Sequence, residues 1–211
     1  RAETLRSMGR MAEALEAYHD EIAKHPENRV AKNGLAKCYI QSGSFSLVAP
    51  LLQKQNRETE QDWRDLYMIC LADWLWGSSP DYLKHVKVGT EQCPFPVTSK
   101  FFSSLLAMVH LRSNDLERSA SILDSEIAST GAQQSNVIAF PLALRAHVAG
   151  LAGQVHAFDK FVHQAEEAHP PATVIDLCKR LRMRFSPKEH FDVAFVELEI
   201  FQMETECLLA A

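Results

Sequence analysis

The chain has 211 residues, of which 46% are hydrophobic and 23% charged, a composition typical of an ordered soluble protein with a substantial core. Its formal net charge is −5, and its longest basic cluster, residues 179–184, is local, so bulk charge argues against nucleic-acid binding. No apolar run approaches the roughly 20 residues that a membrane-spanning helix needs, and we predict no membrane insertion.

A repeat of 34 residues opens the chain. Its predicted turns fall at three equally spaced glycines: Gly9, Gly43 and Gly77. A small residue lies seven positions before each glycine: Ala2, Ala36 and Cys70. Prolines follow the first and third glycines after 17 residues: Pro26 and Pro94. A fixed period of this length predicts stacked copies of one helical supersecondary unit.

The residues around the first turns resemble the tetratricopeptide repeat family. Ala14 and Tyr18, followed by Pro26, match the second helix of the repeat, and residues 35–43 (Leu-Ala-x-x-Tyr, then Gly) match the first. In physical terms, small Ala36 lets two helices approach closely, tyrosines fill the gap between them, and glycine tolerates the turn conformation. The resemblance implies a right-handed α-solenoid.

The repeat weakens along the chain. Residues 62–94 keep the spacing, but the phase slips after Pro94. Two further helix pairs are then predicted, each with 17 residues between the turn and the stop: Asn114 to Gly131, and Gly153 to Pro170. The number of predicted helix pairs is therefore about five.

The segment 172–211 is predicted to form capping helices, divided at Ser186-Pro187, where a cap precedes a proline at the first helical position. The final helix is too apolar for a free surface helix, and we expect it to close the stack or to meet another chain. Its apolar residues are Phe191, Val193, Phe195, Val196, Leu198, Ile200, Phe201 and Leu208.

The predicted fold is all-α: one helical domain over residues 1–211, built as a right-handed α-solenoid of about five tetratricopeptide-like pairs plus C-terminal capping helices. Residues 1–94 hold the in-register repeats and residues 98–171 the degenerate pairs. By the repeat register Arg1 already lies within a helix, so we expect the chain to be a processed product or a piece of a longer one.

Candidate catalytic and metal residues are scattered. Among nine histidines, His156 and His163 share a predicted helix face, but no third and fourth ligand converge on them. Five cysteines form no close pair, which favours reduced thiols and a cytoplasmic location. Cys38 and Cys70 are expected to be core residues. We therefore predict no catalytic residue, no metal and no cofactor. The basic cluster 179–184 is interpreted as a solvated helix face, with an anionic contact as the alternative.

The family resemblance also implies a partner-binding groove. In tetratricopeptide proteins the first helices of successive repeats line a concave face, through positions 2, 5, 9, 12 and 13 of each repeat. These positions are carried onto this chain with the turn residue as position 15, and the candidate partner-binding residues are taken from among them: Asn33, Lys37, Gln41, Arg64, Tyr67, Trp74, Phe101, Met108, Arg112, Phe140 and His147.

These candidates are polar and cationic at one end and apolar toward the middle, which suits a peptide with an acidic or carboxylate end and an apolar body. Chaperone-binding members hold a terminal carboxylate with lysines, asparagines and an arginine. Asn33, Lys37 and Arg64 are of these types but stand at other positions. The alternative is that the aromatic candidates fill a tight superhelix or lie under the terminal helix.

The leading functional hypothesis is a non-enzymatic protein–protein interaction module or adaptor that binds a peptide or subunit in its groove. One alternative is a self-assembling scaffold, a homo-oligomer formed through the repeat ends and the C-terminal helix. The other is a regulatory module of a larger signalling or catalytic protein.

Overall fold

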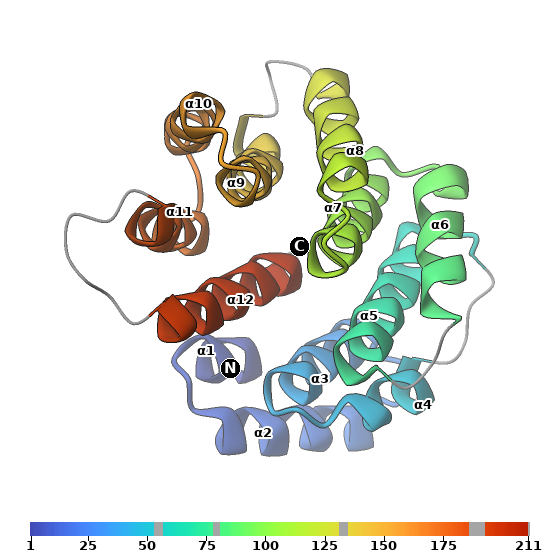
Figure 1. The fold of residues 1–211 in the computed structure, drawn as a ribbon. Coiled ribbons are helices and arrows are strands. Elements are labelled where there is room, and N and C mark those ends of the chain that lie inside the picture. Colours follow the sequence, from blue (N-terminus) through green and yellow to red (C-terminus); the bar gives the residue numbers. More distant parts are fainter. Residues whose placement is uncertain (53–56, 78–80, 131–134, 186–192, 211) are drawn as a thin grey trace. The chain divides into compact units, whose positions relative to one another are not determined.

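The computed structural model describes residues 1–52, 57–77, 81–130, 135–185 and 193–210, without the side chains of residues 135–136, 193–198 and 210. This part of the chain contains twelve α-helices and one short 3-10 helix, and no strand, which confirms the all-α prediction. Helices that follow one another in the chain pack in adjacent pairs (Figure 1). The chain divides into two compact units, Arg1–Ser99 (unit 1) and Lys100–Ala211 (unit 2).

Unit 1 is built from short and medium helices. In chain order they are α1 (Ala2–Ser7), α2 (Met11–Lys24), α3 (Arg29–Gln41), η1 (Phe45–Leu47), α4 (Val48–Leu52), α5 (Glu60–Trp76) and α6 (Tyr82–Gln92). Helix α3 contacts both α1 and α5. Helix α7 (Pro96–Arg112) begins in unit 1 and continues in unit 2.

Side-chain caps define where α3 and α5 begin. The Asn28 side-chain oxygen accepts a hydrogen bond from the amide of Ala31, at 3.1 Å. At α5, the Thr59 hydroxyl accepts from the amide of Asp62, and the Asp62 carboxylate accepts from the amide of Thr59. Such reciprocal capping satisfies amide groups that the first helical turn leaves without partners.

The turns of the predicted repeat all adopt the left-handed conformation. The backbone φ is between +59° and +75° at each of the five predicted turn residues: Gly9, Gly43, Gly77, Asn114 and Gly153. After α3, the Gly43 amide donates to the Ile40 carbonyl and the Ser44 amide to the Tyr39 carbonyl, which is the Schellman pattern. The predicted turns are therefore confirmed, including the two that follow the phase slip.

The core of unit 1 depends on a close approach at Gly34. The Tyr18 side chain is 6% exposed and lies against this glycine, where a Cβ atom would come within 2.3 Å of the tyrosine ring. Ala36 and Cys38 are fully buried on the same helix, and Cys70 is fully buried on α5. The predictions that Tyr18 fills an interhelical gap and that both cysteines are core residues are confirmed.

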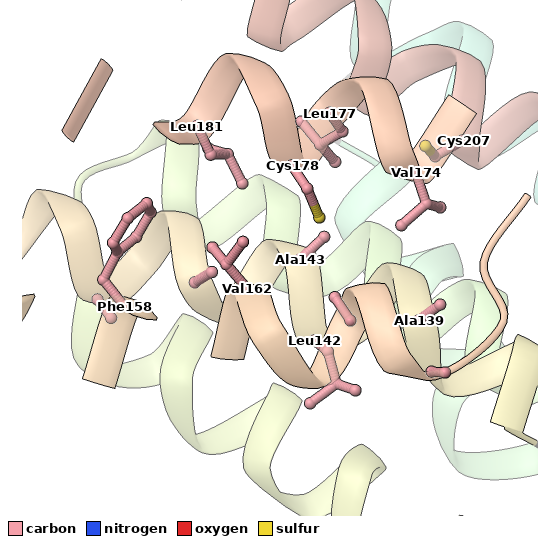
Figure 2. Packing of buried hydrophobic residues seen from close by; sticks show 14 of the residues in the cluster. Ala139, Leu142, Ala143, Phe158, Val162, Val174, Leu177, Cys178, Leu181 and Cys207 are labelled. Atoms are coloured by element: carbon pink, nitrogen blue, oxygen red, sulfur yellow. The ribbon is translucent and has the colours of Figure 1, made fainter. Parts of the chain in front are cut away.

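Unit 2 contains the remaining helices: α8 (Leu116–Ser129), α9 (Ser135–Leu151), α10 (Val155–Glu167), α11 (Ala172–Phe185) and α12 (Val193–Ala210). Ala139, Ala143 and Ala146 give α9 a fully buried small-residue side, which lets α10 and α11 pack closely against it. Figure 2 shows this core, with side chains from α9, α10 and α11 meeting around Cys178. Helix α12 packs on α11 and contributes Cys207 to the core.

The predicted helix stops agree with the observed ends where these are described. Helix α2 ends at Lys24, before Pro26, and α6 ends at Gln92, before Pro94. Helix α10 ends at Glu167, before Pro170. The predicted stop at Gly131, the division at Ser186-Pro187 and Phe191 lie outside the described residues, as do the side chains of Val193, Phe195, Val196 and Leu198.

Candidate partner-binding faces

Unit 1 presents one polar face, formed by residues of α1, α3 and α5: Glu3, Arg6, Lys37, Gln41 and Arg64 (the unit 1 face). On α3, Lys37 and Gln41 are four residues apart, a spacing that places both side chains on the same side of a helix. Lys37 is half-buried and Gln41 is exposed. The structure thus gathers three of the predicted groove residues with two acidic or basic residues of α1.

Lys37 is the unusual member of the unit 1 face. No hydrogen bond or ion pair joins its ammonium group to another residue in the described part of the chain. Burial lowers the pKa of this ammonium, and the positive charges of Arg6 and Arg64 lower it further, against the opposing effect of Glu3. A partly desolvated cation beside two guanidinium groups is a ready receptor for a carboxylate.

The Glu3 carboxylate, which is part of the unit 1 face, is already hydrogen-bonded to Arg6. Arg6 donates from Nε to the Glu3 carboxylate at 3.0 Å and from Nη1 to the Gln41 amide oxygen at 3.0 Å. The Tyr18 hydroxyl donates to the same carboxylate at 2.7 Å. The hydrogen bond from Arg6 is the largest effect that lowers the pKa of Glu3, to about 2. Glu3 therefore holds Arg6 in place and forms no hydrogen bond or ion pair with Lys37, whose ammonium it stabilises only through its negative charge.

Arg64 is the member of the unit 1 face that α5 contributes. Its guanidinium donates to Glu60, one turn earlier on α5, at 3.2–3.3 Å, and the Thr98 hydroxyl donates to the same carboxylate oxygen. The side chain of Arg64 is 40% exposed, so its remaining donors can reach a ligand. Farther along α5, Tyr67 is buried and Trp74 is half-buried.

Asn33 has a structural contact in this arrangement. Its amide donates to Asp65 at 3.4 Å, and Arg29 bridges the buried carboxylates of Asp62 and Asp65 at 2.8 Å and 2.6 Å. Because carboxylates this deeply buried need charged partners, the Arg29 bridge fixes the contact between α3 and α5. Asn33 therefore takes part in the contact between α3 and α5 through its hydrogen bond to Asp65.

In unit 2 two of the predicted groove residues contact α12. Arg112 of α7 and His147 of α9 both contact the carboxylate of Glu204 of α12, and the distance from His147 Nδ1 to the carboxylate is 2.5 Å. The Arg112 guanidinium also lies over the Phe201 ring, 4.6 Å from its centroid. The other candidates are buried, as is Met108, or half-buried, as are Phe101 and Phe140.

Three contributing residues, Glu3, Arg6 and Glu204, were not selected from the sequence, and the repeat register could have found the first two. With Gly9 as position 15, Glu3 and Arg6 are positions 9 and 12 of the first repeat, two of the groove positions. Glu204 had no such signal, because it lies outside the repeats, 57 residues from His147 and 92 from Arg112.

The described residues contain no group of three or more His, Cys, Asp or Glu side chains placed to hold a metal ion. Burial raises the pKa of the cysteine thiols, to about 11 for Cys38 and about 12 for Cys178 and Cys207, which disfavours the nucleophilic thiolate. No described helix is long and apolar enough to span a bilayer. Two basic residues of α11 form ion pairs within unit 2: Lys179 with Asp176, and Arg182 with Glu166.

Comparison of the chain with protein-family models, with curated proteins and with solved structures finds no match.

Proposed function

We propose that the chain is a non-enzymatic interaction module of the tetratricopeptide type, a right-handed α-solenoid whose unit 1 face captures a protein segment through an acidic side chain or a terminal carboxylate. The observation that carries this proposal is the Lys37 ammonium, partly desolvated, without a partner and flanked by Arg6 and Arg64. The equally spaced left-handed turns support the repeat assignment.

The energetics of the unit 1 face favour an incoming anion. A partly buried charge without a partner destabilises the free protein, and a carboxylate that reaches Lys37 supplies a charge-assisted hydrogen bond of about 1.5–3 kcal/mol. Arg6 and Arg64 add a positive field around the same point. The half-buried ring of Trp74, on the same helix as Arg64, offers apolar surface for the rest of the segment.

Burial within unit 2 accounts for part of the apolar terminal helix. Ile200 and Leu208 are each 1% exposed, so these two side chains do not need a second chain to cover them. This favours partner capture over self-assembly through α12. A cytoplasmic location and an attached signalling or catalytic domain remain predictions from the sequence.

Selection from a displayed library of random peptides, each with a free C-terminal carboxylate, tests the proposed function. We expect the wild-type chain to enrich acidic peptides and Lys37→Met to lose that enrichment. Lys24→Met, which removes an exposed lysine of α2, is the matched control and should select the same peptides as wild type.

Affinities measured by fluorescence anisotropy should then fall about tenfold or more in Lys37→Met, since one charge-assisted contact is lost. Circular dichroism checks that all three proteins keep the same helicity. Enrichment of the same acidic peptides by Lys37→Met, or selection of peptides without an acidic group by the wild type, would contradict the proposal.

A further inference from the structure

Helix α12 contacts residues of unit 2 that the repeat register assigns to a partner. The face formed by Met108, Arg112 and His147 is called the α7–α9 face. Met108 and His147 are buried, and both Arg112 and His147 hold the carboxylate of Glu204. A segment of the chain itself therefore occupies the positions that in a binding repeat would contact a ligand.

The side of α12 that is turned inward has a simple pattern. The α12 residues three and four positions before and after Glu204 are apolar and buried or half-buried: Ile200, Phe201, Cys207 and Leu208. Among the other described side chains of α12, Gln202 and Glu206 are exposed, whereas Glu199, Met203 and Thr205 are half-buried and Leu209 is buried. The residues at these spacings form an apolar stripe with the Glu204 carboxylate at its centre.

Glu204 gives this contact its specificity. Its side chain is fully buried, and two cationic or hydrogen-bonding groups from two different helices meet its two oxygens. A buried ion pair adds little net stability compared with an apolar contact of the same shape. However, a helix that brings no carboxylate to this position would leave the charged Arg112 without its partner, which is strongly unfavourable. The α7–α9 face therefore distinguishes a helix with a central glutamate from an apolar helix.

We propose that the α7–α9 face is a binding surface for an amphipathic helix with a central glutamate, and that α12 is its built-in ligand, which a partner protein's helix of the same pattern displaces. The partner's helix carries apolar residues four and three positions before the glutamate and three and four positions after it. The Arg112 side chain remains 33% exposed, so one member of the face is accessible while α12 is bound. This proposal is independent of the unit 1 face.

The test uses the full chain and a labelled synthetic peptide with the sequence of residues 193–210. In the wild type the covalently attached α12 competes at an effective concentration of about 1 mM, so the free peptide should bind weakly. In Glu204→Gln the attached helix loses its ion pair with Arg112, and the wild-type peptide should bind about tenfold or more tightly than it binds the wild-type chain. Glu206→Gln, at an exposed position of α12, is the matched control and should bind as weakly as wild type.

A second peptide in which Gln replaces the glutamate equivalent to Glu204 should lose the gain in affinity for the Glu204→Gln chain. The proposal is wrong if this chain keeps wild-type helicity and binds the wild-type peptide no more tightly than the wild type does. It is also wrong if the two peptides bind alike.

Amide hydrogen exchange of the wild-type chain gives a readout that needs no variant. With the peptide at about 1 mM or above, comparable to the effective concentration of the attached helix, exchange should become faster in α12 and stay unchanged in α10. Unchanged exchange in α12 under these conditions would overturn the proposal.

Discussion

Glu126→Gln should remove most of the pH dependence of the stability of unit 2. The Glu126 carboxyl group lies on α8, is 6% exposed and accepts a hydrogen bond from the Ser104 hydroxyl of α7 at 3.3 Å. Burial raises its pKa from 4.5 to about 8, against the opposing effects of Ser104 and the Lys100 ammonium. Glutamine has the shape of the neutral acid but cannot ionise.

The raised pKa of Glu126 determines whether stability rises or falls with pH. Between 4.5 and about 8 the folded chain keeps a proton that the unfolded chain has released. The stability contributed by the neutral carboxyl is therefore complete below about pH 4.5, falls as the pH rises and is lost above about pH 8. At about 1.4 kcal/mol for each pH unit, the whole interval corresponds to about 5 kcal/mol.

Urea unfolding followed by circular dichroism, at a series of pH values across this interval, measures the effect. The free energy of unfolding of wild type should fall with rising pH, whereas Glu126→Gln should give a much flatter profile. Glu117→Gln, at an exposed position of the same helix, should follow wild type. Parallel profiles for wild type and Glu126→Gln would refute the reasoning.

Two further substitutions test the packing and turns of the repeat. Gly34→Ala should destabilise unit 1 by about 2 kcal/mol, because the clash with Tyr18 outweighs the better helix propensity of alanine. A gain in stability would contradict the close approach of Tyr18 to Gly34. Asn114→Ala should lose about 1 kcal/mol at a φ of +59°, whereas Asn114→Gly should not; urea unfolding of both variants checks this, and equal stabilities would argue against strain at the turn.

The turns could be predicted because their requirement is local. A left-handed residue favours glycine or asparagine whatever surrounds it, so Gly43, Asn114 and Gly153 mark turns even where the rest of the repeat has weakened. Small residues at interhelical contacts are similarly readable, as at Ala36 and Cys70. These signals are sufficient for an all-α chain of adjacent helix pairs.

The contacts of the candidate residues could not be predicted in the same way, because they depend on which distant side chains meet. The register placed Lys37 and Arg64 on candidate positions, but the pairing of Arg6 with Glu3, which leaves Lys37 without a carboxylate, is visible only in the structure. Contact of Arg112 with Glu204 joins residues 92 positions apart, with no spacing rule to connect them.

The pKa of Lys37, followed by NMR of its side chain, tests the central claim most directly. In the free chain this pKa should lie below the ordinary value of 10.5, because of burial and the neighbouring guanidinium groups. Binding of a selected acidic peptide should raise it, since the incoming carboxylate stabilises the charged ammonium. A pKa that is already at its ordinary value in the free chain, or that does not change when the peptide binds, would contradict the account.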